Sequence, residues 1–234
     1  MDIILVPGFW LDASSWDEVT PPLVAAGHQV HPLTLPGLEA KDAPRSGVGL
    51  RQHIDAVVKA IDDVGGPVVL VGHSGGGAII YGALDQRPDR VLRAIYVDSG
   101  PLGDGGNIND ELPSDGDDIP LPAWKVFEED DLIDLDDGLR AAFIARAIPQ
   151  PKGVATDRQV LHDERRLTVP TTVICCEFTS EQLKRWMAAG DPFVAELARV
   201  QDVDYVDLPT GHWPQFTRPA DLGTVLLAAV DRTS

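Results

Sequence analysis

The sequence predicts an α/β fold built on a mostly parallel, doubly wound sheet of about six strands. Two observations support this prediction. Six apolar runs have the length of strands and are mostly continuous rather than alternating, as is typical of strands covered on both faces. Segments with helical periodicity separate the runs, so strands and helices alternate along most of the chain. The runs lie at residues 3–6, 29–35, 68–71, 92–97, 171–176 and 205–208.

The first hundred residues predict the first part of the sheet and the helices that cover it. The chain enters a strand almost at once, at Ile3. Gly27 and Gly65 stand where the preceding helices should end, because glycine is the usual residue just after a helix. One helix before Gly65 has a clear apolar face, which consists of Leu50, Ile54, Val57, Val58 and Ile61.

The alternation stops between Gly100 and Val169, where a segment rich in Gly, Asp and Pro precedes a helix expected around 139–147. We interpret residues 101–168 as a cap inserted after the strand 92–97, with residues 1–100 and 169–234 forming the two parts of the core. Up to about Asp118 the composition is that of a mobile loop, which makes this segment a candidate lid. An ordered decoration without a gating role is the alternative.

The last part of the chain predicts two more strands and two helices. Thr179 and Gln182 match a capping box, so a helix should begin almost as soon as the strand 171–176 ends. Pro219 fits the first turn of the final helix. That helix has an apolar face made of Leu222, Val225, Leu226 and Ala229.

Composition restricts the classes of function. The 234 residues are 44% hydrophobic and carry a formal net charge of −18. Residues 101–137 hold thirteen acidic side chains and one basic one, Lys125, which disfavours nucleic acid and anionic membranes as partners. These acids lack the regular spacing of an EF-hand loop, so we expect a solvated face and no metal. The oligomeric state stays open.

The two cysteines and the beginning of the chain predict the compartment. Cys175 and Cys176 are adjacent within an apolar strand and should point to opposite faces, which disfavours a disulfide or a metal site. The first residues lack the basic and long apolar segments of a signal peptide, and no apolar run is long enough for a membrane span. We therefore expect a cytoplasmic protein that does not insert into membranes.

The motif Gly72-His73-Ser74-Gly75-Gly76 follows the strand 68–71 and is typical of a nucleophile elbow. A serine raised on a sharp turn between a strand and a helix has strained backbone angles, and small residues are needed two positions before and after it. A glycine-rich turn or a phosphate-binding loop is the alternative. The motif makes Ser74 the candidate nucleophile, and the side chain of His73 should point away beneath the turn.

A serine hydroxyl is a poor nucleophile near neutral pH, so it needs a base and a third group that orients the base. His212 follows the last strand and lies in a loop just before the last helix, at the edge of the sheet where Ser74 is expected. The other histidines have no motif around them. We therefore assign His212 as the candidate base.

The elbow, the cap and the late Gly211-His212 together resemble the α/β-hydrolase superfamily over nearly the whole chain. Within it, the turn Pro7-Gly8-Phe9-Trp10 resembles that of short esterases and hydroxynitrile-lyase relatives. Three departures stand out. The family usually has His-Gly where this chain has Pro7-Gly8, its two leading antiparallel strands are absent, and Trp213 replaces the lysine that the lyases keep beside the histidine. Lyase chemistry is therefore disfavoured.

The resemblance leaves two candidates for the acid. Relatives most often place it shortly after the strand that here is 171–176, but the predicted capping box shortens that loop and leaves only Glu177. Other relatives, such as haloalkane dehalogenases, place it at the end of the strand after the elbow helix, which here is Asp98. We assign Asp98 as the acid and keep Glu177 as the alternative.

Acyl transfer also requires donors aimed at the developing oxyanion. The amide of Gly75 begins a helix and supplies one of them, and the resemblance implies that the amide of Phe9 supplies the other. The side chains of Trp10, Trp213 and Phe216 should stand near the mouth and form an aromatic substrate pocket, with ordinary core packing as the alternative.

These assignments predict a serine hydrolase that needs no cofactor and acts on a small molecule. Its substrate would be a small to medium, neutral and rather apolar ester or lactone, cleaved through an acyl-enzyme. Thioester and carbon–carbon bond hydrolysis use the same triad and stay open. A ligand-binding receptor with this fold and a cofactor-independent oxygenase are the alternatives from other classes.

Overall fold

The six predicted strands form one parallel sheet in a computed structural model that describes residues 1–232. Their order across the sheet is β2-β1-β3-β4-β7-β8, and every neighbouring pair is parallel. The α/β fold predicted from the sequence is confirmed. The strands are β1 (Asp2–Val6), β2 (Gln29–Pro32), β3 (Val68–His73), β4 (Val91–Val97), β7 (Thr171–Cys175) and β8 (Val203–Asp207).

Each central strand is apolar on both sides because helices cover both faces of the sheet. Successive side chains of a strand point to opposite faces. Accordingly, Ile4 and Leu70 pack in one buried cluster, whereas Ile3 and Val69 pack in another. Continuous apolar runs were the sequence pattern that predicted this arrangement.

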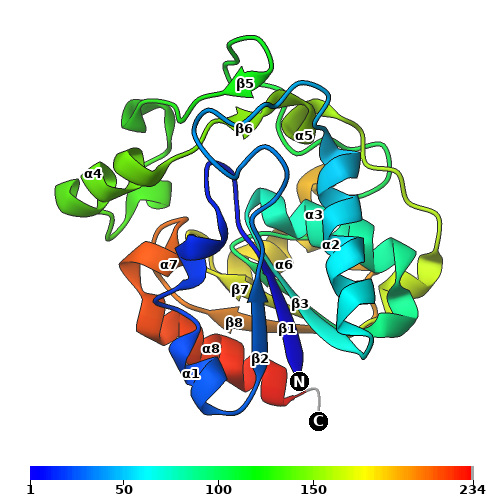
Figure 1. The fold of residues 1–234 in the computed structure, drawn as a ribbon. Coiled ribbons are helices and arrows are strands. Elements are labelled where there is room, and N and C mark those ends of the chain that lie inside the picture. Colours follow the sequence, from blue (N-terminus) through cyan, green and yellow to red (C-terminus); the bar gives the residue numbers. More distant parts are fainter. Residues whose placement is uncertain (233–234) are drawn as a thin grey trace.

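Helices α2 and α3 lie on one face of the sheet, and α1 and α8 lie on the other (Figure 1). Gly65 ends α2 with a φ of 76°, and Thr179 caps α6 together with Gln182, as predicted. Among residues 1–232, no helix is long and apolar enough to cross a membrane. The helices are α1 (Pro21–Ala25), α2 (Leu50–Val64), α3 (Gly75–Gln86), α4 (Asp137–Arg146), α5 (Lys152–Thr156), α6 (Ser180–Ala189), α7 (Pro214–Thr217) and α8 (Pro219–Asp231).

Strand β2 is shorter than the apolar run 29–35 that predicted it. It lies at the edge of the sheet and pairs only with β1, and the register ends where Leu5 meets Pro32. A proline has no N–H to continue a ladder, and a second proline follows at position 36. The chain therefore leaves the sheet before the apolar run is complete.

The chain between β4 and β7 lies over the carboxyl ends of the strands (Figure 1). This segment, residues 101–168, is called the cap below. It contains α4, α5 and a small antiparallel pair formed by β5 (Asp118–Ile119) and β6 (Gln150–Pro151).

The glycine-rich beginning of the cap is tied to its end by main-chain hydrogen bonds. The amide of Gly105 donates to the carbonyl of Gln159 at 2.8 Å, and the amide of Gln159 donates to Gly106 at 2.7 Å. Ile108 donates to Ala155 at 3.1 Å. Composition alone did not predict this pairing, and gating by the segment stays a prediction.

Candidate active site

Ser74 lies on a sharp turn between β3 and α3. Its backbone has a φ of 53° and a ψ of −126°, a conformation that residues other than glycine rarely adopt. A Cβ atom on Gly72 would lie 2.6 Å from the carbonyl oxygen of Gly76, and one on Gly76 would lie 2.7 Å from that of Pro7. The two glycines are therefore required by close main-chain approach, as the elbow motif predicts.

His212 reaches Ser74 from the loop that follows β8. Its Nε2 lies 2.8 Å from the Ser74 Oγ, and its Nδ1 lies 2.7 Å from Oδ2 of Asp98. A carboxylate only accepts hydrogen bonds, so the Nδ1–H donates to Asp98 and the neutral Nε2 can accept the serine proton. The three residues predicted as nucleophile, base and acid thus form one continuous hydrogen-bonded chain.

Asp98 is fixed at the end of β4, on the strand next to that of Ser74. Its side chain is fully buried, and its backbone has a φ of 45°. Its second oxygen, Oδ1, accepts the amide N–H groups of Cys176 at 2.8 Å and Glu177 at 3.2 Å. Hydrogen bonds at both oxygens fix the orientation of the Asp98 carboxylate, so that Oδ2 stays directed at His212.

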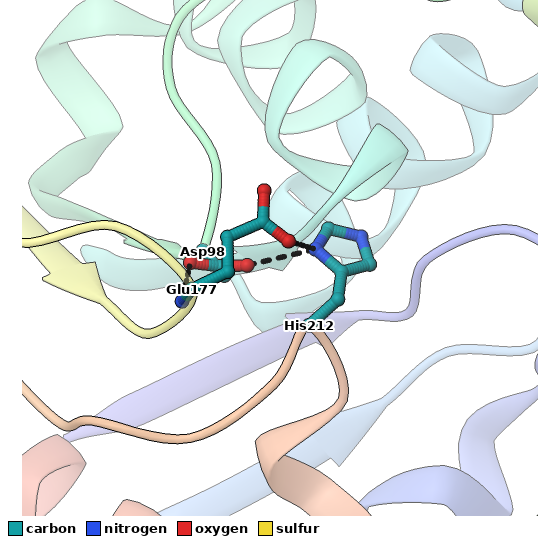
Figure 2. A group of neighbouring side chains, drawn as sticks. All are labelled: Asp98, Glu177 and His212. Carbon is teal, nitrogen blue, oxygen red and sulfur yellow. Dashed lines mark hydrogen bonds and ion pairs between the residues drawn. The ribbon is translucent and has the colours of Figure 1, made fainter. Parts of the chain in front are cut away.

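Glu177 approaches the same edge of the imidazole as Asp98 (Figure 2). Its Oε2 lies 3.3 Å from the Nδ1 of His212, and its side chain is 26% exposed. The structure therefore brings both candidate acids to His212 and gives Asp98 the shorter contact. One possible metal-ligand atom from each of Asp98, Glu177 and His212 lies within 4.8 Å of the other two, which is close enough for a metal ion. However, Nδ1 of His212 and both oxygens of Asp98 already take part in hydrogen bonds.

The two carboxylates change the basicity of His212. Burial lowers the pKa of a histidine, but the contacts and charges of Asp98 and Glu177 outweigh it and raise the pKa of His212 to about 10. Two carboxylates beside one imidazole thus favour its cation, so the fraction of His212 that can accept the Ser74 proton grows as the pH rises toward this pKa.

His73 lies beneath the elbow, where the sequence predicts it, and holds the main chain of the histidine loop. Its Nε2 donates to the carbonyl oxygen of His212 at 2.7 Å. Burial, followed by the positive charge that His212 can carry, lowers the pKa of His73 to about 3. His73 is therefore a neutral donor that positions the loop of His212.

The turn after β1 approaches the elbow closely enough for an oxyanion site. A Cβ atom on Gly8 would lie 3.0 Å from the Cβ of Ser74, and one on Gly75 would lie 2.6 Å from the ring of Phe9. Among the described residues, the amides of Phe9 and Gly75 have no hydrogen-bond partner. Two free donors beside Ser74 are what an oxyanion requires.

A cavity of about 850 Å³ opens beside Ser74 and His212. Part of its lining comes from the beginning of the cap, between residues 101 and 108, and part from the segment 192–199 together with Phe178 and Leu183. Phe193 lies in this segment and is 72% exposed. The lining is mainly apolar, and its charged side chains are mostly acidic.

The structure does not bring the three aromatic side chains predicted to form a substrate pocket into this cavity. Trp10, Trp213 and Phe216 do not line it. Trp213 is 2% exposed and packs edge to face against Phe127 and Phe143 of the cap. The indole N–H of Trp10 donates to the Ile119 carbonyl at 3.0 Å. Trp10 and Trp213 are therefore buried where the cap packs on the core, whereas Phe216 is partly buried and packs against Phe143 of the cap.

A family model described as the alpha/beta hydrolase family matches residues 3–223. The chain belongs to this family. A pyrethroid hydrolase of Sphingobium wenxiniae is 34% identical over 97 residues, which are 41% of this chain and only 35% of that protein. Methylesterase 1 of Arabidopsis thaliana is 24% identical over 260 residues, which cover 98% of this chain and 95% of the relative.

Among solved structures, an extracellular alpha/beta-hydrolase from a Paenibacillus species has the same fold. Its TM-score is 0.78 at 20% identity, with 98% of each chain covered. The prediction of an α/β-hydrolase is therefore confirmed for the family and the fold.

Three features of this alpha/beta hydrolase were missed by sequence reasoning. Ser99 donates its hydroxyl to the Ser74 carbonyl at 2.6 Å and so supports the elbow. The cavity wall at 192–199 has no motif. The carbonyl of Asp131 in the cap accepts a hydrogen bond from the amide of His212 at 2.8 Å. Only Ser99 had a signal in the sequence, because it directly follows the candidate acid at a strand end.

Proposed function

We propose that this alpha/beta hydrolase is a serine esterase or lactonase that acts through an acyl-enzyme. The observation that carries the proposal is the chain from the Ser74 Oγ to His212 at 2.8 Å and from His212 to Asp98 at 2.7 Å. Nucleophile, base and orienting acid in hydrogen-bond contact are the arrangement that activates a serine.

The reaction follows from this geometry. The Ser74 Oγ attacks the ester carbonyl carbon while His212 Nε2 takes its proton, and the carbonyl oxygen becomes an oxyanion held by the amides of Phe9 and Gly75. The imidazolium, stabilised by Asp98, then protonates the leaving alcohol as the bond from carbon to oxygen breaks. Water attacks the acyl-enzyme by the same steps and releases the acid and free Ser74.

The cavity supports a small to medium, neutral and rather apolar substrate. Its volume of about 850 Å³ lies in the range of small-molecule sites, and apolar residues of the cap and of 192–199 form its walls. Its lining contains one arginine, Arg199, and four acidic side chains, which are Asp98, Asp104, Glu177 and Glu196. This balance of charges disfavours anionic esters.

Intact-mass spectrometry after treatment with a fluorophosphonate tests the activated serine without knowledge of the substrate. We expect one adduct on the wild type and none on Ser74→Ala. Ser114→Ala is the matched control, because Ser114 is an exposed cap serine, and it should be labelled like the wild type.

Folded wild-type protein that forms no adduct, or a Ser74→Ala variant that is still labelled, would overturn the proposal. The first result would favour a ligand-binding protein or a cofactor-independent oxygenase. A positive result justifies screening neutral esters and lactones for turnover.

A further inference from the structure

The segment 192–199 lines part of the cavity and leaves one aromatic ring uncovered. Phe193, at 72%, is the most exposed large hydrophobic side chain among residues 1–232, and it lines the same cavity as Ser74 and His212. A single exposed apolar side chain on an ordinary surface needs no explanation, but this one lies in the candidate active site. The other exposed large hydrophobic side chains do not line this cavity; they are Val24, Val126, Ile133, Ile144 and Val160.

The exposure of Phe193 does not come from a loose segment, because its neighbours are anchored. Val194 and Leu197 are each 3% exposed and pack in the same core cluster. The amide of Phe193 donates to Oδ1 of Asp191 at 2.9 Å and so caps the short helical turn Pro192–Val194. This turn buries the side chain of Val194 and leaves the ring of Phe193 outside the core.

Glu196 fixes the same segment to helix α3, which begins directly after Ser74. Its Oε1 accepts the hydroxyl of Tyr81 on α3 at 2.6 Å and Nη2 of Arg166 at 3.0 Å. Its Oε2 accepts Nη1 of Arg199 at 2.8 Å. Two arginines therefore offset the charge of this carboxylate, although Glu196 lines the cavity. The segment presents an apolar ring to a ligand rather than a free carboxylate.

A series of aromatic contacts connects Phe193 to the edge of the triad. The ring of Phe193 packs edge to face on Trp186, with centroids 6.3 Å apart, and Trp186 packs on Phe178 at 5.5 Å. Phe178 lines the cavity and directly follows Glu177, whose Oε2 lies 3.3 Å from Nδ1 of His212. Two ring contacts thus lie between Phe193 and Phe178. A substrate must therefore extend beyond its reacting groups in order to cover Phe193.

We propose that Phe193 is a specificity-determining residue, which binds an apolar group of the substrate that lies beyond the ester linkage. The preferred substrates are then esters or lactones that carry an alkyl chain or an aromatic ring distal to the carbonyl group. Covering the ring removes apolar surface from water, which is the source of the preference. The inference rests on the proposed function and names the substrate class of the same cavity.

The place of Phe193 in the cavity determines which kinetic constant should respond. Phe193 takes no part in the hydrogen-bonded chain of Ser74, His212 and Asp98. Its contact with a distal group should therefore be equally strong in the ground state and in the transition state. Such a contact lowers KM and leaves kcat unchanged. Loss of the ring should weaken the binding of long substrates and leave the reaction of short ones unaffected.

Three esters separate the reacting centre from the distal group: ethyl acetate, methyl octanoate with a long acyl chain, and octyl acetate with a long alcohol. Acid release is followed in a pH-stat for the wild type, Phe193→Ala and Phe193→Leu, after circular dichroism has confirmed folding. The matched control is Val160→Ala, because Val160 is an apolar residue that is 59% exposed and does not line the cavity.

In Phe193→Ala, kcat/KM for at least one of the long esters should fall about fivefold or more, through an increase in KM. Ethyl acetate should react within about twofold of the wild-type rate, because it does not extend to Phe193. Phe193→Leu should keep most of the preference, since leucine retains much of the apolar surface. Val160→Ala should match the wild type with all three esters.

Binding measured without turnover separates this inference from the proposed function. The two long esters are titrated into Ser74→Ala, and into a variant that also carries Phe193→Ala, with protein-observed NMR. At least one of them should bind about fivefold or more weakly when both residues are replaced.

The inference is overturned if Phe193→Ala leaves both long esters unaffected, if it slows ethyl acetate as much as the long esters, or if the long esters bind equally to both Ser74→Ala proteins or to neither. Self-association of the wild type that is lost in Phe193→Ala, measured by sedimentation velocity, would also overturn it, because the ring would then bind a second copy. A wild type that hydrolyses no ester and forms no fluorophosphonate adduct would contradict the proposed function instead, and the NMR titration would still decide the role of Phe193.

Discussion

Replacing the acid is the most informative perturbation, because two carboxylates compete for the same nitrogen. In Asp98→Asn, the amide oxygen would keep the bonds from Cys176 and Glu177, which are 2.8 and 3.2 Å long in the native protein. The new NH₂ group would then face His212 Nδ1, where a hydrogen-bond acceptor is needed.

Two donors cannot share one hydrogen bond, so the imidazole would adopt the other tautomer. Its Nε2 would then carry a proton toward the Ser74 Oγ, now 2.8 Å away, and Ser74 would have no acceptor for its own proton. A wrong tautomer in a triad typically costs about 10⁴-fold in kcat, or about 5.5 kcal/mol of transition-state stabilisation.

Glu177→Gln should behave differently. The Oε2 of Glu177 lies farther from Nδ1, at 3.3 Å, and makes no hydrogen bond, so it contributes charge near the imidazole but does not orient the ring as Asp98 does. We expect a plateau kcat/KM within about tenfold of the wild type and an activity limb shifted to lower pH, because one of the groups that raise the pKa of His212 is gone.

The assay is kcat/KM for a neutral chromogenic ester from pH 6 to 10.5, measured for the wild type and both variants after circular dichroism has confirmed folding. The reasoning is refuted if Glu177→Gln loses as much activity as Asp98→Asn, or if Asp98→Asn keeps near-native turnover.

Three further predictions concern pH, salt and packing. First, kcat/KM of the wild type should rise with pH through a limb well above 6.5, since the carboxylates raise the pKa of the base; a flat profile from pH 5 to 8 would argue against His212. The pKa of His212 is higher in the folded than in the unfolded protein, so protonated His212 stabilises the fold. This contribution to the free energy of unfolding is complete below pH 6.5 and is lost as the pH rises through the folded pKa. Urea unfolding at several pH values can measure it. Second, added salt should lower KM for anionic esters more than for neutral ones, since thirteen acidic residues lie at 101–137; equal responses would mean that this part of the cap does not face the entrance. Third, Gly76→Ala should destabilise the protein by about 2 kcal/mol or more, because its Cβ would lie 2.7 Å from the Pro7 carbonyl oxygen, and an unchanged unfolding midpoint would contradict this packing.

Local patterns predicted the sheet and the elbow because each depends on residues close together in sequence. Continuous apolar runs marked the six strands, and Gly72 and Gly76 marked the turn around Ser74. Strand ends at one edge of a parallel sheet also bring His212 and Asp98 to Ser74 without knowledge of side-chain contacts.

Contacts between the cap and the core could not be predicted in this way. Whether Trp213 faces a substrate or packs against Phe127 and Phe143 depends on where the cap folds back, and no local period encodes that. The same holds for Asp131, which is one of many acidic residues until the fold brings it to His212. The sequence favoured Asp98 over Glu177 because the predicted capping box shortens the loop after the strand 171–176, but it could not show that both carboxylates approach His212. In the structure, Nδ1 of His212 lies 2.7 Å from Asp98 and 3.3 Å from Glu177.

The central claim is that Ser74 carries the acyl group during turnover. Its most direct test is acid-quenched mass spectrometry of the wild type during hydrolysis of a p-nitrophenyl ester of a short fatty acid, followed by peptide mapping. We expect an acyl adduct on the peptide that contains Ser74 and none in Ser74→Ala. Turnover that persists in Ser74→Ala, or an acyl group mapped to another residue, would contradict it.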